Sequence, residues 1–287
     1  MIEILKNLGK LVILGFAGIG VVVTTVYIGM QTGSFNVPGS IDNRNAWFGA
    51  VPTTTIALAT EYGCQSKYSQ VDPCEWDQTV QWEVVKGGLI KDVEVIKRVS
   101  AETGVSERMI AAAVTPEQIR FFADNREVFK RYFEPLKLLA SLSKFSLGVS
   151  GIKQDTAFLI EQYANSTSSE FYPGPEAASL LSYQEGDDQS QVLFERLTNE
   201  KDHYYSYLYT ALFLKEVESQ WRRQGYDISE RPDVLVTLFN LGFNASVPKA
   251  DPKVSGSTIK VGGQSYSFGY LGTLFYQSDE LSEEFSK

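Results

Sequence analysis

Residues 107–122 read "ERMIAAAVTPEQIRFF", an apolar stretch with helical spacing that contains a carboxylate near its end. Ile110 and Val114 precede Glu117 by seven and three positions. Residues at these spacings lie on one face of an α-helix, so Glu117 shares the face that packs against the core. An unpaired charge in that position is costly, which makes Glu117 a candidate for a specific role.

The residues around this stretch predict where the neighbouring helices begin and end. A preceding helix is predicted over 89–103, after an interruption at the glycine pair 87–88, and Gly104 is a suitable residue to end it. Pro116 permits a bend just before Glu117, because the residue before a proline avoids the α conformation.

The rest of the chain also shows mainly helical patterns. Further helices are predicted over 125–142, 151–165, 175–183, about 190–224 and 231–241. Residues 257–268, "STIKVGGQSYSF", alternate around a glycine pair and predict a two-residue β-hairpin, and a closing helix is predicted over 270–285. The sequence therefore predicts a mainly α fold with one small β-hairpin.

An uncharged apolar run, residues 11–30, stands apart from this pattern. Twenty such residues are long enough to cross a membrane, which predicts a single N-terminal transmembrane helix. Lys6 and Lys10 precede the run and no basic residue follows before Arg44, so the N-terminus is expected in the cytoplasm and the remainder outside the inner (cytoplasmic) membrane. A cleaved secretory signal is the alternative.

The two cysteines fit an extracytoplasmic location. Cys64 and Cys74 enclose nine residues and are expected to form a disulfide in an oxidising compartment, with two free thiols as the alternative. We divide the chain into a cytoplasmic stub and anchor over 1–33, a linker and disulfide loop over 34–80, and one domain over 81–287.

Several classes of function are disfavoured by composition. The net charge of −9 argues against nucleic-acid binding, which needs a basic surface. His203 is the only histidine and lies in a helical aromatic stretch, so we expect a structural role for it and predict no metal site. The chain lacks a nucleotide-binding P-loop, and no cofactor is expected.

Carboxylate chemistry remains, and Glu117 has the setting that it needs. An apolar environment favours the protonated form of a carboxyl group, which allows it to act as the general acid in glycosidic bond cleavage. The alternative is a structural ion pair between Glu117 and Arg120.

Three stretches together resemble a known family. They are "IAAAVTPEQIRFF" at 110–122, "FSLGVSGIKQDTA" at 145–157 and "LVTLFNLGF" at 235–243. In this order they resemble motifs of the lysozyme-like lytic transglycosylases and of their goose-type lysozyme relatives. The resemblance covers roughly residues 84–245 and implies a lysozyme-like α+β fold with a single catalytic glutamate.

The resemblance assigns candidate roles to individual residues. Glu117 takes the position of the catalytic glutamate, and Ser146 and Asn240 take positions that orient the sugar or the carboxylate. Helix capping and a buried turn contact are the respective alternatives for Ser146 and Asn240. Phe239 stands where the family has a tyrosine, which removes a hydroxyl group from the site.

The middle stretch can be aligned in two registers. The ungapped register places Gly151 where the family has a glutamine, whereas a shifted register keeps a glutamine as Gln154. Gln118 replaces the family's usual serine after the catalytic glutamate. Tyr266 follows the glycine pair of the hairpin and is a candidate for a wall of the binding cleft, with core packing as its alternative.

The implied activity is cleavage of the MurNAc-GlcNAc bond of peptidoglycan by a membrane-anchored lytic transglycosylase. Its partners would be glycan strands and, through residues 11–30, the membrane. Two alternatives stay open: a catalytically inactive lysozyme-like domain that binds glycan or acts as an envelope scaffold, and an unrelated helical adaptor. An open groove at Glu117 beside Ser146 and Asn240 would support the transglycosylase and the inactive lysozyme-like domain, whereas a Glu117 sealed against an arginine would argue against both and leave the adaptor.

Overall fold

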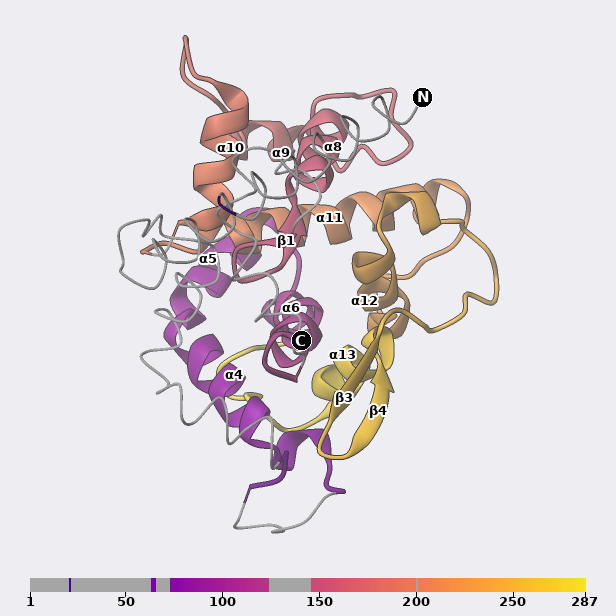
Figure 1. Cartoon of the computed structure of the whole chain (residues 1–287). Coiled ribbons are helices and arrows are strands. Elements are labelled where there is room, and N and C mark those ends of the chain that lie inside the picture. Colours follow the sequence, from indigo (N-terminus) through magenta and orange to yellow (C-terminus); the bar gives the residue numbers. More distant parts are fainter. Residues whose placement is uncertain (1–20, 22–62, 66–72, 124–145, 200) are drawn as a thin grey trace, which may run out of the picture.

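The computed structural model describes residues 21, 63–65, 73–123, 146–199 and 201–287 (Figure 1). The side chains of residues 121–123, 146 and 147 are not described. Apart from Val21, the expected anchor lies outside the described residues, as does the helix expected over 125–142. Within the described part of the chain, no helix is long and apolar enough to cross a membrane.

The described residues are mainly helical, as predicted. The α-helices are α4 (Val80–Lys91), α5 (Val93–Thr103), α6 (Glu107–Ala123), α8 (Gln154–Ala164), α9 (Pro175–Leu180), α10 (Gln189–Thr198), α11 (Tyr204–Arg223), α12 (Pro232–Leu241) and α13 (Phe268–Gln277). Two 3₁₀ turns, η1 (Trp76–Gln78) and η4 (Phe243–Ala245), accompany them. The strands are β1 (Ser146–Leu147), β2 (Ile152–Lys153), β3 (Thr258–Val261) and β4 (Gln264–Ser267).

The strands form two antiparallel pairs. In the β3–β4 hairpin, Val261 lies opposite Gln264 across Gly262 and Gly263, which both have positive φ. The predicted hairpin is therefore confirmed. The β1–β2 pair, in which Ser146 lies opposite Lys153, is an additional element that the sequence did not predict.

Helix α6 occupies the centre of the fold. It packs against α4, α5, α11, α12, α13 and β3. In Figure 1, α4 and α5 lie on one side of α6, α12 and α13 lie on the other, and α11 crosses above. Every residue of α6 from Arg108 to Ile119 is buried, so this helix is enclosed around its whole circumference.

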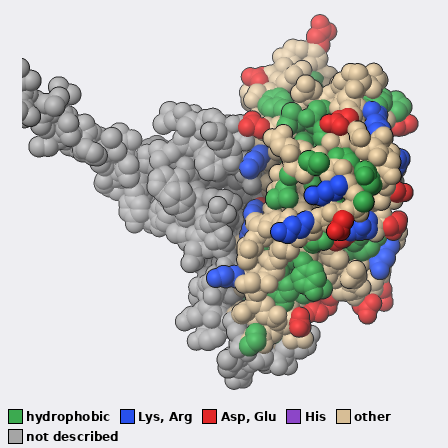
Figure 2. All heavy atoms as spheres, turned by 90° about the vertical axis from the view of Figure 1, so that its right-hand side faces the viewer, with side chains coloured by type: hydrophobic (Ala, Val, Ile, Leu, Met, Phe, Trp, Pro, Cys, Tyr) green, Lys and Arg blue, Asp and Glu red, His purple; other side chains and the backbone are tan. Residues whose placement is uncertain are grey.

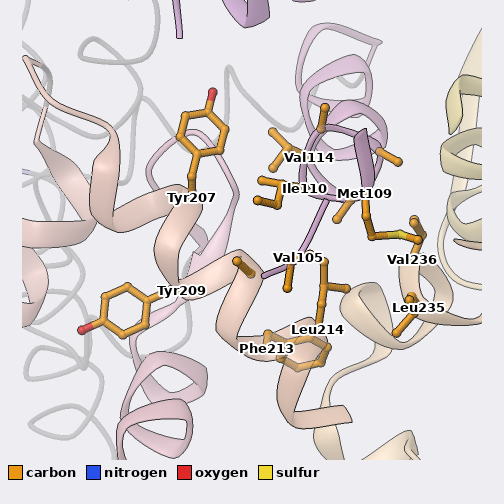
Figure 3. Packing of buried hydrophobic residues seen from close by; sticks show 14 of the residues in the cluster. Val105, Met109, Ile110, Val114, Tyr207, Tyr209, Phe213, Leu214, Leu235 and Val236 are labelled. Carbon is orange, nitrogen blue, oxygen red and sulfur yellow. The ribbon is translucent and has the colours of Figure 1, made fainter. Parts of the chain in front are cut away.

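Close packing of aliphatic and aromatic side chains holds the other helices around α6. Figure 3 shows Ile110 and Val114 of α6 on the side of α11, with Val236 of α12 beside Met109. None of these four side chains is more than 3% exposed. This enclosure means that a polar group on α6 must find its partners within the protein.

Helix α6 continues through Pro116. A proline inside a helix has no N–H group to donate to the carbonyl four residues earlier. In α6 the carbonyl that loses this donor is that of Ala112. Gly272 of α13 lies directly against that carbonyl, since a Cβ atom on Gly272 would lie 2.7 Å from the Ala112 oxygen. The close approach of α13 to α6 therefore depends on a glycine at this position.

Several predictions of helix boundaries were wrong. The closing helix expected over 270–285 is α13, which ends at Gln277, and the helix expected over 89–103 is divided between α4 and α5. The glycine pair 87–88 lies inside α4 and does not interrupt it. The helix expected over 190–224 is divided into α10 and α11. Asn199 accepts backbone hydrogen bonds from Lys201 and Asp202, and the Asp202 carboxylate accepts one from Tyr204, so side chains of the segment cap a turn there.

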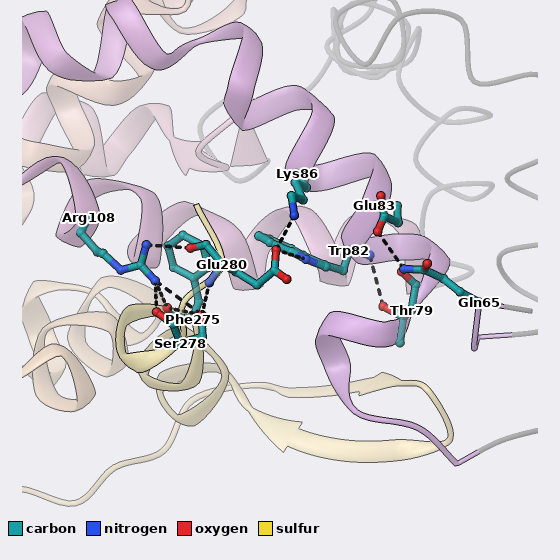
Figure 4. A network of polar contacts seen from close by, with 9 residues as sticks. All are labelled: Gln65, Thr79, Trp82, Glu83, Lys86, Arg108, Phe275, Ser278 and Glu280. Atoms are coloured by element: carbon teal, nitrogen blue, oxygen red, sulfur yellow. Dashed lines mark hydrogen bonds and ion pairs between the residues drawn. The ribbon is translucent and has the colours of Figure 1, made fainter. Parts of the chain in front are cut away.

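A polar network fixes residues 275–280 to α6 and α4 (Figure 4). The guanidinium of Arg108, which is 1% exposed, donates to the backbone carbonyls of Phe275, Tyr276, Ser278 and Glu280 at 2.6–3.0 Å. The Glu280 carboxylate accepts from Lys86 at 2.7 Å and from the indole of Trp82 at 3.1 Å. These bonds satisfy a buried arginine at the start of the central helix.

The disulfide segment is joined to the hairpin. Cys64 and Cys74 form the predicted disulfide. The amide of Cys74 donates to the carbonyl of Gly262 at 2.8 Å, and the side chain of Gln264 donates to the carbonyl of Cys74 at 2.8 Å. The disulfide therefore holds the segment on which the tip of the β3–β4 hairpin rests.

Candidate functional site

Glu117 lies in the last two turns of α6, and both sides of its carboxylate are covered. The residue is 5% exposed. Its Oε2 atom accepts a short hydrogen bond from Nη2 of Arg120, which follows one turn later. This contact is an ion pair between neighbours on one helix.

Arg120 is itself held from two directions. Its Nη1 atom donates to the hydroxyl oxygen of Ser257 at 3.2 Å, and its guanidinium carbon lies 5.9 Å from the ring centroid of Phe268. The Arg120 side chain is 21% exposed, compared with 7% for that of Glu117. Arg120 therefore lies between the carboxylate and the protein surface.

Asn240 is connected to this pair through Ser257. The side-chain oxygen of Asn240 accepts a hydrogen bond from the Ser257 amide at 2.8 Å. Gly256 lies against the same oxygen: a Cβ atom on Gly256 would lie 2.9 Å from the side-chain oxygen of Asn240. Gly256 also has a φ of +109°. A continuous chain of hydrogen bonds thus runs from Asn240 through Ser257 and Arg120 to Glu117.

The turn between β1 and β2 covers the other carboxylate oxygen. Gly151 has a φ of +69°, and a Cβ atom on it would lie 2.5 Å from Oε1 of Glu117 and 2.6 Å from its carboxyl carbon. A glycine is required there both by the backbone conformation and by the contact. This contact gives a physical reason for Gly151, which in the ungapped alignment stands where the family has a glutamine.

The same turn is fixed on its far side by α10 and α11. A Cβ atom on Gly148 would lie 2.1 Å from the carbonyl oxygen of Leu197 and 2.5 Å from the hydroxyl of Ser206. Ser150, which is 1% exposed, donates its hydroxyl hydrogen to the Ser206 carbonyl at 2.9 Å. Gly151 is therefore held against Glu117 by a well-anchored segment.

The structure brings only some of the candidate residues together. Glu117 and Asn240 belong to the connected set, whereas the backbone of Ser146 lies in β1 and its side chain is not described. Gln154 is 4% exposed, and its amide donates to the carbonyl and the hydroxyl of Ser190. Its nitrogen therefore joins α8 to α10.

Phe239 and Tyr266 pack against other aromatic rings. Phe239 lies edge-on to Phe213 of α11, with ring centroids 5.5 Å apart. Tyr266 is 6% exposed and stacks on the ring of Tyr270, which is 51% exposed, at 6.4 Å. Burial raises the pKa of the Tyr266 hydroxyl, and the nearby charge of Glu75 raises it further. These contacts agree with the core-packing alternative for Tyr266.

Sequence reasoning missed Ser257 and did not assign Gly151 to the site. Sequence reasoning considered Arg120 only as the partner of Glu117 in a structural ion pair. Its spacing of three residues from Glu117 predicts that pairing. The buried, arginine-paired Glu117 is the arrangement that this alternative predicts. The resemblance placed Asn240 near Glu117, and Asn240 is linked to the pair through Ser257, but it did not place Gly151 there.

Another acidic residue has an unusual environment. Glu216 of α11 is 0% exposed, and neither of its carboxyl oxygens makes a hydrogen bond among the described residues. Burial raises its pKa well above 4.5. By contrast, Glu161 is also buried but accepts hydrogen bonds from the hydroxyls of Tyr183 and Tyr209.

No metal-binding cluster is found among the described residues. His203, at the start of α11, contacts Oδ2 of Asp92 at 2.9 Å through Nδ1, and the same oxygen accepts from the Tyr207 hydroxyl at 2.8 Å. All three side chains are buried and join α5 to α11. This arrangement agrees with a structural role for His203.

Comparisons with protein-family models, with curated proteins and with solved structures found no match to this chain.

Proposed function

We propose that this chain is a lysozyme-like peptidoglycan lytic transglycosylase in which Glu117 is the general acid and base. The observation that supports the proposal is the meeting of three distant segments at one carboxylate. Gly151 touches Glu117 from the β1–β2 turn, and Asn240 reaches it through Ser257 and Arg120. These segments contain the three stretches on which the family resemblance rests.

The proposed reaction needs one carboxyl group. Protonated Glu117 donates its proton to the oxygen of the bond between MurNAc C1 and GlcNAc O4 as that bond breaks. The resulting carboxylate then takes the proton of the MurNAc 6-hydroxyl while O6 bonds to C1. The products are a GlcNAc end and a 1,6-anhydro-MurNAc end, and Glu117 is protonated again. No second carboxylate is required to activate water, in contrast to an inverting hydrolase.

The location of the reaction is part of the same proposal. The apolar run 11–30 supports a single membrane anchor with its N-terminus in the cytoplasm. The disulfide between Cys64 and Cys74 supports an oxidising compartment for the rest of the chain. The domain would then act on glycan strands outside the inner membrane.

A second candidate function is a catalytically inactive lysozyme-like domain that binds glycan or acts as an envelope scaffold. The ion pair between Glu117 and Arg120 favours it. A neighbouring guanidinium stabilises the ionised form of a carboxyl group, whereas a general acid must begin the reaction protonated. In this case the connected residues would maintain a binding surface without catalysis.

The test is to incubate the full-length protein in detergent with purified peptidoglycan and to analyse the products by mass spectrometry. Anhydro-ended muropeptides from the wild type, and none from Glu117→Gln, would support the transglycosylase. Reducing ends would indicate a hydrolase instead. Intact glycan with retained binding would support the inactive domain, and neither product nor binding would leave Glu117 as a structural ion pair.

A pair of glycine variants tests whether Gly151 belongs to the site. Gly151→Ala and Gly104→Ala both place a side chain at a similar positive φ, +69° and +74°, but only the first meets Glu117. Both variants should lose about 1–2 kcal/mol of stability from backbone strain. Only Gly151→Ala should lose product formation at a temperature at which both remain folded.

A further inference from the structure

The two oxygens of the Glu117 carboxylate are covered by different kinds of group, one by backbone and the other by a side chain. Oε1 faces the backbone of Gly151, whose turn is fixed by Gly148 and Ser150 against the α10–α11 region. Oε2 is covered by the side chain of Arg120, which ends 21% exposed. A glycosidic oxygen can therefore reach the carboxyl group only if Arg120 moves aside.

Few contacts oppose that movement. Apart from Glu117, the guanidinium makes one hydrogen bond among the described residues, a 3.2 Å contact with the neutral hydroxyl of Ser257. Arginine has five N–H donors, so most of them are available to a ligand. The ring of Phe268 is the other neighbour of the guanidinium, and at 5.9 Å from the ring centroid this contact is near the outer limit of a cation–π interaction.

The partner that suits a displaced guanidinium is a carboxylate. Arginine binds carboxylates through two parallel hydrogen bonds, which neutral hydroxyl groups of a sugar do not reproduce. A ligand carboxylate would therefore replace Glu117 as the partner of Arg120, so that the guanidinium stays paired. The same movement would uncover Oε2 of Glu117 for the substrate.

The charges of the chain do not favour the binding of anions in general. The face drawn in Figure 2 carries basic and acidic side chains interspersed, without one continuous basic area. The chain as a whole has a net charge of −9, so general attraction of anions is weak. Recognition of an anionic group near Glu117 would therefore depend on individual cations. Arg120 lies on the same helix as Glu117, and the exposed Lys153 lies in β2, which follows the turn that contains Gly151.

We propose that Arg120 is a latch on Glu117 that a substrate carboxylate opens, so that the protein prefers glycan strands with free lactyl carboxylates on MurNAc. Such carboxylates are present where the stem peptide has been removed, and they are absent where the lactyl group is amide-linked. The inference rests on the proposed function and names the substrate class of the same site. Arg120 acts through Glu117 and through the ligand, and is a positioning residue.

The test compares two glycan preparations that differ only in this group. Strands are stripped of peptides with an amidase, and half of the sample is then converted to the neutral lactyl methylamide. The full-length wild type should cleave the free-acid strands at least about tenfold more efficiently in kcat/KM, as one charge-assisted contact predicts. Arg120→Met should reduce this ratio to about one, and Arg120→Lys should retain part of it.

The ratio separates a latch from a purely structural arginine. A structural role would lower the rates on both preparations equally and leave the preference in Arg120→Met unchanged, which would overturn the inference. Equal rates of the wild type on both preparations would overturn it as well. Thermal unfolding of each variant identifies any loss of folding, and the ratio is then measured at a lower temperature.

A binding measurement keeps the inference separate from the proposed activity. If the wild type cleaves neither preparation, the proposed transglycosylase fails, and calorimetric titration with the same strands tests anion recognition alone. A preference for the free acid that is lost in Arg120→Met would support Arg120 as the carboxylate-binding group. Absence of any preference would overturn the inference.

Discussion

Glu216 should make the stability of the fold decrease as the pH rises, and Glu216→Gln should remove much of this dependence. The side chain is fully buried in α11, and neither carboxyl oxygen has a hydrogen-bond partner among the described residues. Burial raises the pKa of this group well above its ordinary value of 4.5. The folded protein therefore retains a proton that the unfolded chain releases.

The sign and the size of the effect follow from this difference in bound protons. Between pH 4.5 and the raised pKa of Glu216, the folded state binds more protons than the unfolded state, so the free energy of unfolding falls with rising pH. The slope is about 1.4 kcal/mol per pH unit for one group. Over the pH range between 4.5 and the raised pKa, the wild type should therefore lose stability at about this slope, and Glu216→Gln should not.

Urea unfolding at a series of pH values measures this loss directly. The informative quantity is the difference in unfolding free energy between Glu216→Gln and the wild type, because other titrating groups cancel in it. Glu283→Gln, which removes the same charge from an exposed glutamate, is the matched control. A difference for Glu216→Gln that stays constant over this range would refute the reasoning, since it would mean that the carboxyl group is solvated or paired in the folded protein.

Three further predictions concern stability. Glu218, whose pKa burial raises to about 7, should add a loss of stability between about pH 4.5 and 7, so Glu218→Gln should flatten urea midpoints measured across that range. Arg108→Met should lower the free energy of unfolding in urea by about 3 kcal/mol or more, because four carbonyls lose a charged donor. Arg222→Met, at an exposed position, should lower it by less than about 0.5 kcal/mol. Equal losses in the two variants would contradict the role of the buried network. Reduction of the disulfide between Cys64 and Cys74, which closes a loop with a separation of 10 residues, should lower the stability by about 3 kcal/mol in a thermal scan with and without reductant, and unchanged midpoints would contradict this.

The parts of the fold that sequence reasoning predicted depend on neighbouring residues. The β3–β4 hairpin requires two residues of positive φ in succession, and Gly262-Gly263 provides them. The end of α5 follows from Gly104, whose φ of 74° stops the helix. The break between α10 and α11 falls in a polar stretch, TNEKDH at 198–203. It was missed because the apolar spacing does not show the side-chain hydrogen bonds with which Asn199 and Asp202 cap the turn.

The candidate site was only partly predictable for a related reason. Glu117 and Arg120 are neighbours on one helix, so their pairing follows from a spacing of three. Ser257 contacts Arg120 across a separation of 137 residues, and no local pattern indicates that contact. The role of Gly151 depends on where the β1–β2 turn packs, which a single sequence without a fold does not determine.

The attachment of Arg108 to residues 275–280 has a consequence for the order in which the protein is made. The backbone of Arg108 also donates to the carbonyl of Ser286, and the Ser286 amide donates to the carboxylate of Glu107 at 2.9 Å. The first turn of the central helix thus acquires its partners only after residue 286 has left the ribosome. Until then a growing chain cannot complete the contacts of this turn, so the central helix gains its full set of partners only when synthesis is nearly finished.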